Sequence, residues 1–591
     1  MPQTRREFLG AALGLTAIPL LAACGAPAPV QPAVAPTTIS AAAPKPAAAA
    51  AAQGAAIFAN PQPQAPSDKP PTYGGTLVAP TYGDPLFGGD TMFGALSVTF
   101  TATYPVNGDG SFVKQARDDV YKIAPHLADS WENNATYTEW VFKIRDGVTW
   151  HDGTAFTAQD AAWWLNLGLF GARSGDKIRP PAIWGRVLGD VDLVDTPDAS
   201  HVRIKLRGPE PLLPLNLATQ QVAHPRHLMQ PRIDQGDVMV TPSDVGWVSV
   251  GPFKLTQYDK GSRIQFKRHD GYWEKDAKGN KLPYLDGISM PYVRDANAMD
   301  NAFTGGQIDA GIRNSNFALS KSRLETYRKT LGDKFYLAQI GFNPYGLHFN
   351  VTRPGPFQDV RVRKAVAMWI DQAGMTEVLG GFAQAETFLR PTNPYNDPEF
   401  LQWPGWNVAT QAADRAEAKR LLAEAGFPTG FEATILSQQN WQPWAVYYQG
   451  QLSDLGIKAN LDLKDAGTYT QLTATKDPQW ELKVSGITSV THPWLLKDAL
   501  NAVSHGGVGM AHDDPHVVEL FDRMKAVLPD EARTKAVYSE LQRYMIRDQP
   551  YVVPTFSQLY EIPYRSYVQG LYPPAENTYH NLDFATVWLD K

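Results

Sequence analysis

Cysteine is nearly absent from this chain, since Cys24 is the only one among 591 residues. A single thiol excludes a disulfide framework, a zinc finger and a thiol redox pair. Positive charge is not in excess either: 54 Lys and Arg stand against 60 Asp and Glu, so there is no basic footprint for nucleic acid. The hydrophobic share of 43% nevertheless fits a globular protein and excludes a wholly disordered one.

The common motifs of catalysis are absent as well. The sequence contains no His-Glu-x-x-His, no Gly-x-Ser-x-Gly and no phosphate-binding Gly-x-x-x-x-Gly-Lys-Ser/Thr,. We therefore expect a protein that is not an enzyme and carries no cofactor. Carboxylates are abundant, so a secreted hydrolase with a glycosidase-like acid pair stays a remote alternative.

The N-terminus reads as an export signal. Thr4-Arg5-Arg6-Glu7-Phe8-Leu9 resembles a twin-arginine signal, and the apolar run 11–23 is too short to span a bilayer, which takes about 20 residues. It ends in Leu21-Ala22-Ala23-Cys24, which resembles a bacterial lipobox. We expect a signal peptide at 1–23 and a lipid anchor on Cys24, the alternative being a chance apolar run. No later stretch reaches about 18 uninterrupted apolar residues.

A tether is expected at 24–72. Residues 25–71 hold 17 Ala and 11 Pro and almost no large apolar side chains. Proline blocks helix propagation, and such a segment cannot build a core, so it suits an extended spacer between anchor and folded body.

The folded body reads as α/β. Strands are predicted at 140–145, 432–436 and 481–485, and helices at 161–169, 412–425 and 531–547. Thr157-Ala-Gln-Asp160 is a capping-box variant that opens the first of these helices. Strands that precede loops and helices indicate parallel crossovers.

A set of motifs then resembles family 5 of the extracellular solute-binding proteins of ABC importers, the dipeptide- and oligopeptide-binding group. They occur in family order: Ala124–Trp131, Phe142–Thr154, Phe156–Asp160, Gly251–Leu255, Gly271–Trp273, Gly305–Asp309, Phe357–Ala365, Ala418–Gly426 and Leu455–Lys458. Most of these residues are read as structural: Trp131, Trp150 and Trp273 as core, and Asp359 as a helix cap.

The resemblance implies the enlarged type II periplasmic-binding-protein fold, in which two α/β lobes joined by two strands trap a ligand. Lobe I is expected at 73–335 plus 551–591, with an inserted subdomain near 111–190, and lobe II at 336–550. The implied role is the capture of a solute, an oligopeptide by family default, and its delivery to ABC permease subunits from the periplasmic or extracytoplasmic side of the membrane.

The candidate binding residues lie in loops after strands, where open α/β sheets bind ligands. Residues 437–444 and 486–494 follow two predicted strands and supply aromatic faces and amides suited to stacking and directional hydrogen bonds: Asn440, Trp441, Trp444, His492 and Trp494,. Tyr82 and Asp90, after the first strand of lobe I, are further candidates. The alternative is that the tryptophans cover the core of their own lobe.

The loop 488–494 departs from the peptide binders, which typically carry an acid there for the ammonium of the peptide. It reads Thr-Ser-Val-Thr-His-Pro-Trp, and a buried ammonium without a counter-charge is costly. An oligosaccharide or other neutral polar solute is therefore the second hypothesis. A nickel carrier using His512 and His516 is remote, because this stretch reads better as a polar loop with Asp514 capping a helix.

Overall fold

The structure is a computed structural model, and it describes residues 67–81, 111–116, 119, 121–181, 188–218, 223–311, 321–379, 383–384, 386–473, 479–487, 490–500, 514–571 and 584–591. Cys24, Tyr82 and Asp90 lie outside these ranges, as do the signal peptide and most of the tether. Among the helices within these ranges, none combines the length and the apolar character that crossing a bilayer requires.

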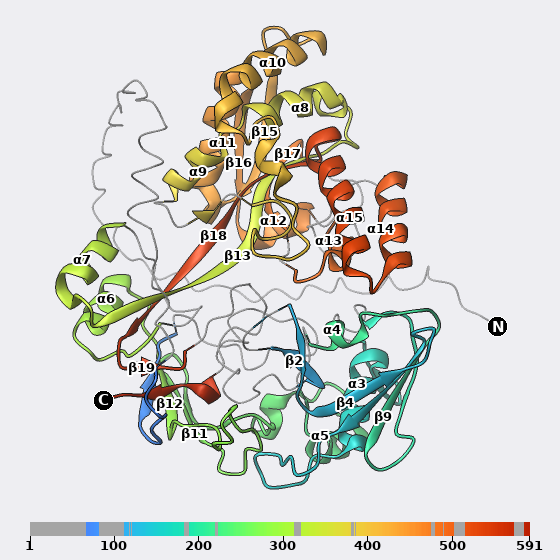
Figure 1. Cartoon of the computed structure of the whole chain (residues 1–591), viewed down its shortest axis with the longest axis vertical. Coiled ribbons are helices and arrows are strands. Elements are labelled where there is room, and N and C mark those ends of the chain that lie inside the picture. The colour runs from blue at the N-terminus through green and yellow to red at the C-terminus, as the bar shows by residue number, and fades with distance from the viewer. Residues whose placement is uncertain are drawn as a thin grey trace, which may run out of the picture. The chain divides into compact units, whose positions relative to one another are not determined.

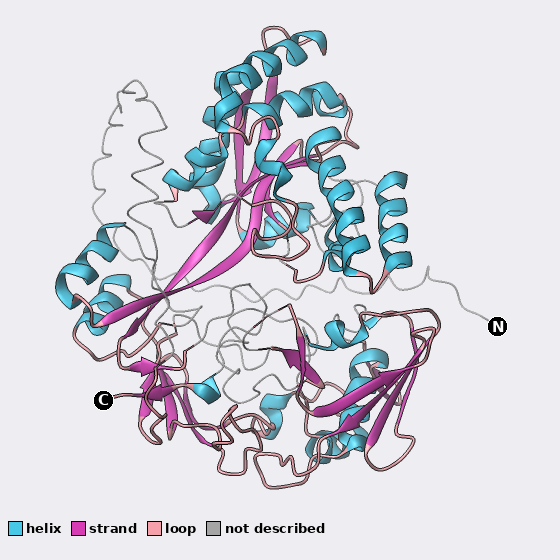
Figure 2. Ribbon diagram, in the orientation of Figure 1, coloured by secondary structure: helices cyan, strands magenta, loops and turns pink. Residues whose placement is uncertain are grey.

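The described chain is mixed α/β and contains three larger sheets (Figures 1 and 2). The first has the order β1-β12-β11-β10 and is built from Thr76–Val78, Gly287–Pro291, Arg263–Arg268 and Phe253–Asp259. Near it lie α6 (Ala296–Thr304) and α7 (Lys321–Leu331), and β19 (Val568–Gln569) pairs with β20 (Trp588–Leu589).

The second sheet has the order β4-β5-β9-β8, from Ala128–Asn133, Glu139–Ile144, His201–Leu206 and Val191–Asp195. Its helices are α3 (Ala158–Phe170), α4 (Leu213–Ala218) and α5 (Arg226–Asp234), and two hairpins accompany it, β2–β3 (Val113–Gln115, Ile123–Pro125) and β6–β7 (Ala172–Ser174, Lys177–Arg179). The predicted strand at 140–145 is confirmed as β5, where buried residues alternate with more exposed ones.

The capping box that opens α3 is also confirmed. The Thr157 hydroxyl accepts the Asp160 amide, and the Asp160 carboxylate accepts the Thr157 amide in return,. The hydrophobic cluster of this sheet runs from Phe112 to Val250 and includes Trp150, with Trp131 and Trp273 packed against it. The unit is thus larger than the predicted insertion at 111–190, because β8, β9 and α5 pack on the same core.

The third sheet has six strands in the order β14-β18-β13-β17-β15-β16. Their bounds are Ala383–Gln384, Val552–Arg565, Phe335–Phe349, Leu482–Gly486, Glu432–Gln438 and Lys458–Lys464. β15 pairs in parallel with both β16 and β17, which confirms the predicted strands at 432–436 and 481–485 and the parallel crossovers.

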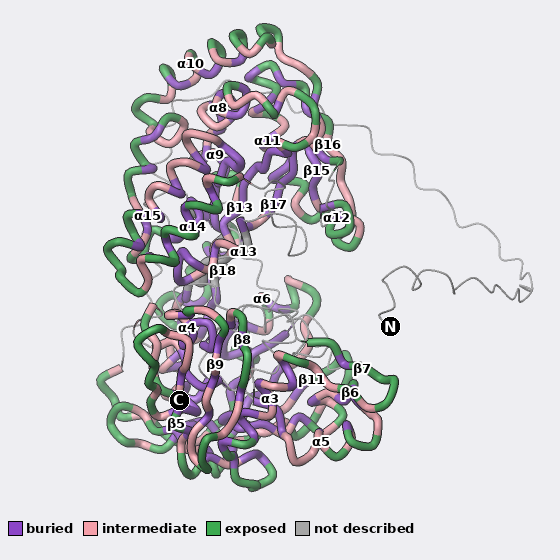
Figure 3. Tube along the Cα trace, turned by 90° about the vertical axis from the view of Figure 1, so that its right-hand side faces the viewer, coloured by how far each residue is buried: buried purple, intermediate pink, exposed green. Residues whose placement is uncertain are grey.

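Two groups of helices flank this sheet, and each has its own hydrophobic cluster. The first cluster contains residues of α8 (Val360–Trp369), α9 (Gln372–Val378), α10 (Gln411–Glu424) and α11 (Gln442–Leu455). The second contains residues of α13 (Leu496–Leu500), α14 (Pro515–Val527) and α15 (Glu531–Arg543). A further helix, α12 (Ala466–Thr473), follows β16. The tube in Figure 3 shows buried backbone concentrated along β13, β17 and β18.

Two strands, β13 and β18, belong to more than one core. Their antiparallel pairing runs from Phe335↔Arg565 to His348↔Val552, with register shifts between Gly341 and Pro344 and between Tyr345 and Gly346. At one end they contribute to the core of the six-stranded sheet, and at the other end to the core that contains β1, β10, β11 and β12. A lobe boundary at 550/551 thus precedes a strand shared by two cores; the lobe limits stay predictions.

Asp309, from the motif Gly305–Asp309, ties the start of the folded body to its end. Its buried carboxylate accepts the Val78 amide at 2.7 Å, the Tyr567 hydroxyl at 2.6 Å and the Lys591 ammonium at 3.0 Å. Burial and the neighbouring carboxylate raise the pKa of Tyr567. One side chain therefore holds β1 and the segments around β19 and β20 together.

We expect Asp309→Ala to lower the free energy of unfolding by about 3 kcal/mol, because the half-buried Val78 amide and Tyr567 hydroxyl and the exposed Lys591 ammonium lose their shared buried acceptor,. The measurement is the urea midpoint followed by circular dichroism. Asp333→Ala, at an exposed turn position, is the matched control and should move the midpoint little. Equal midpoints for the two variants would contradict this role of Asp309.

Candidate ligand-binding site

The candidate site is the edge of the six-stranded sheet at which β15 and β17 end. The two strands run parallel, so Gln438 and Gly486 terminate at the same edge, as ligand-binding loops of open α/β sheets do. A single 3-10 turn, Gln439–Trp441, leads from β15 into α11. The predicted loop residues 438–441 and 486–494 therefore start from neighbouring strand ends.

Trp441 is the predicted aromatic residue that keeps part of its surface accessible at this edge. Its ring stacks on Trp444 at a centroid distance of 5.8 Å and an interplanar angle of 13°, and it meets Tyr345 and Tyr469 edge-on, each at 5.5 Å. It is half-buried, and Asn440 beside it is exposed. A fixed indole thus directly follows an exposed amide residue, Asn440, in the chain.

Gly486 allows this aromatic packing. A Cβ at Gly486 would lie 3.1 Å from the Tyr345 ring, the residue with which it pairs across β13 and β17. Such a contact is tighter than ordinary van der Waals packing, so a side chain here would displace the Tyr345 ring that packs against Trp441. From the sequence, Gly486 was predictable only as the first residue of the loop 486–494.

Trp444 and Trp494 lie in cores instead. Trp444 is 7% exposed and packs on Tyr345 and Phe556. Trp494 is 5% exposed, lies in the cluster of α13–α15 and meets Phe521 edge-on. Both match the alternative in which tryptophans cover their own lobe. The predicted roles of Trp441, Asn440 and His492 in binding stay predictions.

His492 has a defined structural role. Its Nδ1 accepts the Trp494 amide at 3.1 Å, and its ring meets Tyr395 edge-on at 4.7 Å. Burial lowers the pKa of His492 to about 3, so the imidazole is neutral at physiological pH. The Asn393 amide group donates to the Thr491 carbonyl at 3.2 Å, which fixes the same loop from the other side.

Sequence reasoning missed a buried cation next to this edge. Lys483 in β17 is fully buried, its ammonium lies 4.7 Å from the centre of the Trp480 ring, and burial lowers its pKa to about 7. Its cross-strand partner His348 is equally buried and has a pKa of about 3, first because of burial and then because of Lys483. The strand 481–485 carried no signal for this, since a lysine in a strand is usually solvated.

The described residues contain no group of three or more His, Cys, Asp or Glu placed to hold a metal ion. Of the polar stretch considered for nickel, His505, His512 and Asp513 lie outside the described residues. Asp514 caps α14 by accepting the His516 amide, as predicted, and it also accepts the hydroxyls of Tyr544 and Tyr551.

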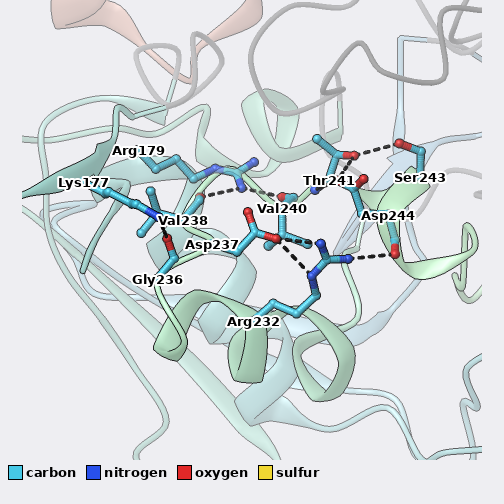
Figure 4. A network of polar contacts seen from close by, with 10 residues as sticks. All are labelled: Lys177, Arg179, Arg232, Gly236, Asp237, Val238, Val240, Thr241, Ser243 and Asp244. Carbon is cyan, nitrogen blue, oxygen red and sulfur yellow. Dashed lines mark hydrogen bonds and ion pairs between the residues drawn. The ribbon is translucent and has the colours of Figure 1, made fainter. Parts of the chain in front are cut away.

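A separate hollow of about 450 Å³ lies between α3, β6 and α5, lined by Trp163, Leu167, Phe170, Arg173, Gln230 and Asp234 among others. A polar network joins β7, α5 and the loop 236–244 that follows α5 (Figure 4). In it Arg232 pairs with Asp237 and donates to the Asp244 carbonyl, while Arg179 donates to the carbonyls of Val238 and Val240. These hydrogen bonds and the ion pair hold the loop 236–244, so we assign the network a structural role.

Comparison with known proteins places this geometry in a family. Residues 122–495 match the model described as bacterial extracellular solute-binding proteins, family 5 middle. A probable ABC transporter-binding protein of Deinococcus radiodurans is 23% identical over 527 residues, covering 79% of this chain and 86% of that protein. The glutathione-binding protein GsiB of Pectobacterium atrosepticum is 25% identical over 411 residues, covering 66% and 72% respectively.

A solved structure shows the same fold. The periplasmic binding protein DppA of Helicobacter pylori, in complex with the peptide STSA, superposes with a TM-score of 0.69 at 20% identity, over 88% of this chain and 99% of that one. The predicted fold class, a two-lobed α/β periplasmic-binding-protein fold, is thereby confirmed.

We expect the His492 cap to weaken as the pH falls from 7 to 5. The folded-state pKa is about 3, whereas an exposed imidazole titrates near 6.5. The opened loop therefore takes up a proton that the closed loop cannot, and the local stability is complete above about pH 6.5 and is lost as the pH falls toward 3. The open fraction should rise about 20-fold between pH 7 and 5.

The measurement is hydrogen exchange of the Trp494 amide, corrected for its intrinsic pH dependence. The Thr468 amide, which donates to the Asp465 carboxylate at 3.0 Å, serves as the internal control. Hydrogen bonds from the Thr468 hydroxyl and amide lower the pKa of Asp465, so this cap stays intact at pH 5. Constant protection of Trp494 over this range would show that His492 does not govern the loop.

Proposed function

Because the chain belongs to the bacterial extracellular solute-binding proteins of family 5, we propose that it captures an oligopeptide and delivers it to the permease of an ABC importer. The proteins that it matches are substrate-binding proteins of ABC transporters and not enzymes. The observation that carries the proposal is the family match over 122–495, which includes both strand ends of the candidate site.

Two of the similar proteins bind peptide-like solutes according to their names: GsiB binds glutathione, and DppA holds the peptide STSA. In this chain we assign Trp441 as the stacking surface and Asn440 as a hydrogen-bonding side chain of the solute pocket. Trp444 supports the ring of Trp441 from behind, through the 5.8 Å stack. His492 and Trp494 act on the solute only by fixing the loop that carries them.

The shared strands β13 and β18 support capture between two lobes. The solute would contact both lobes only when they close, and closing would bend the two strands at their register shifts between Gly341 and Gly346,. A second candidate function, uptake of an oligosaccharide or another neutral polar solute, is favoured by the loop 486–494. That loop carries no Asp or Glu, and its only imidazole is buried and neutral.

We further propose that the protein is exported and anchored through a lipid on Cys24. Support comes from the lipobox-like Leu21–Cys24 and from the Ala- and Pro-rich segment that follows. Family members work outside the cytoplasm, and a tether of this length allows the folded body to reach a permease beside its anchor.

The ligand class is tested by thermal-shift screening, because a solute that binds only the folded state raises the melting temperature. We expect tri- to pentapeptides to give shifts, and we expect the shifts to survive N-acetylation, since the loop lacks an acid for the ammonium. Hits restricted to oligosaccharides would replace the peptide proposal by the second candidate. Hits that require a free amine would place the binding acid outside this loop.

Trp441→Ala should weaken binding of the best peptide by about 1–3 kcal/mol, through the loss of stacking and apolar burial. Trp441→Phe should recover part of the loss. Trp444→Ala is the matched control: it should chiefly lower the melting temperature, because Trp444 is a core residue. If Trp441→Ala lowers stability as much as Trp444→Ala and leaves affinity unchanged, Trp441 is not a binding residue.

Cys24→Ser should abolish lipid modification and move the protein from the membrane fraction to the soluble extracytoplasmic fraction, with unchanged circular dichroism. Metabolic labelling with a fatty acid and fractionation measure both effects. A variant that stays bound to the membrane in the same amount would overturn the anchor.

A further inference from the structure

Two adjacent leucines just after β9 enter two different hydrophobic cores. Leu213, at the start of α4, is fully buried in the cluster of the β4-β5-β9-β8 sheet. Leu212 is half-buried and packs against the cluster formed by α13, α14 and α15. The backbone is fixed here, because the Glu210 amide donates to the Tyr137 carbonyl at 3.0 Å. A single short segment thus touches both units.

Glu210 adds a buried carboxyl group to this segment. The residue is 5% exposed, and its Oε1 has no hydrogen-bond partner among the residues that the structure describes. Burial raises its pKa, and Lys497 and Lys525 oppose that rise electrostatically. Lys497 lies in α13 and Lys525 in the last turn of α14. Glu210 thus belongs to one unit, and the two lysines whose charges act on it belong to the other.

Lys497 also covers Trp494. Its ammonium lies 4.5 Å from the centre of the Trp494 ring, so this one cation acts on an indole of its own unit and on Glu210. A second contact joins the same two units, a hydrogen bond of 3.2 Å between the hydroxyls of Tyr121 and Thr392. Apolar packing of Leu212, the Tyr121–Thr392 hydrogen bond and the electrostatic influence of two lysines on Glu210 therefore act together here.

We propose that residues 209–213 form a latch, in which Leu212 and Glu210 engage the Trp494–Lys497 surface and hold the two lobes closed without touching the solute. The latch rests on the proposed function only in that the lobes close around a ligand. Because it stabilises the closed form directly, part of the closed population exists before any solute arrives. Its loss should weaken every solute by the same factor, since only the closing equilibrium changes.

The test measures the distance between two spin labels in the ligand-free full chain. Cys24→Ser removes the native thiol, and Ala199→Cys and Ala532→Cys, both exposed, place one label beside β8–β9 and one on α15. We expect a short-distance population beside a longer-distance one in this background. Glu210→Gln and Leu212→Ser should each convert at least about half of it to longer distances.

Exchanging the charges of Glu210 and Lys497 distinguishes a specific latch from a general loss of packing. Lys497→Glu should open the chain like Glu210→Gln, and Lys497→Glu combined with Glu210→Lys should restore the short distance. Glu139→Gln is the control: it removes an exposed ion pair with Lys205 on the same sheet and should leave the distances unchanged. Unchanged distances in Glu210→Gln, or no recovery on charge exchange, would overturn the latch.

The two proposals fail separately, because the distance measurement contains no solute. Should no peptide bind while Glu210→Gln still opens the chain, the ligand assignment falls and the latch stands. Should peptides bind while Glu210→Gln and Leu212→Ser leave the distances unchanged, only the latch proposal fails. A loss of affinity in Glu210→Gln that differs between two peptides by more than about threefold would also contradict it, because a latch away from the solute cannot discriminate.

Discussion

The pairing of β13 with β18 is the constraint on which the described fold depends. These strands form a ladder from Phe335 to His348 on one side and from Arg565 to Val552 on the other, and each end is buried in a different core. A ladder of this kind couples the positions of the two cores, because its hydrogen bonds fix the register of the strands along their length. It also bends more readily where that register shifts, near Gly341–Pro344. Close approach is required as well: a Cβ on Gly346 would lie 2.4 Å from the Val553 carbonyl oxygen.

Local elements of this fold were predictable from sequence because their signals are local. The Thr157–Asp160 box, the Asp359 and Asp514 caps and the alternation in β5 each need only a few neighbouring residues. The long strands were not predictable in the same way. β13 contains Pro344 and β18 contains Pro554 and Pro563, and proline normally argues against a central strand. Only the partner strand, some 200 residues away, makes these segments extended.

The candidate site shows the same division. The strand ends after 438 and 486 were predictable, since strand patterns followed by polar loops are visible in the sequence. Which tryptophan faces outward was not. Trp441 and Trp494 occupy comparable loop positions, but Phe521 of α14 packs over Trp494. No sequence signal near residue 494 predicts that contact. Buried charges are hidden for the same reason, because Glu210 and Lys483 acquire their surroundings from remote helices and strands.

The order in which the chain becomes structured follows from the shared carboxylate of Asp309. The β4-β5-β9-β8 core is assembled from residues 112–250, so its contacts are within reach soon after that stretch is synthesised. The sheet that contains β1 is different, because Val78 meets Asp309 and Asp309 meets Tyr567. Closing such long loops is slow, and β1, the first strand among the described residues, is therefore among the last to be fixed in the fold. During synthesis its edge is exposed to other strands and to chaperones for longer than any part of the 112–250 core.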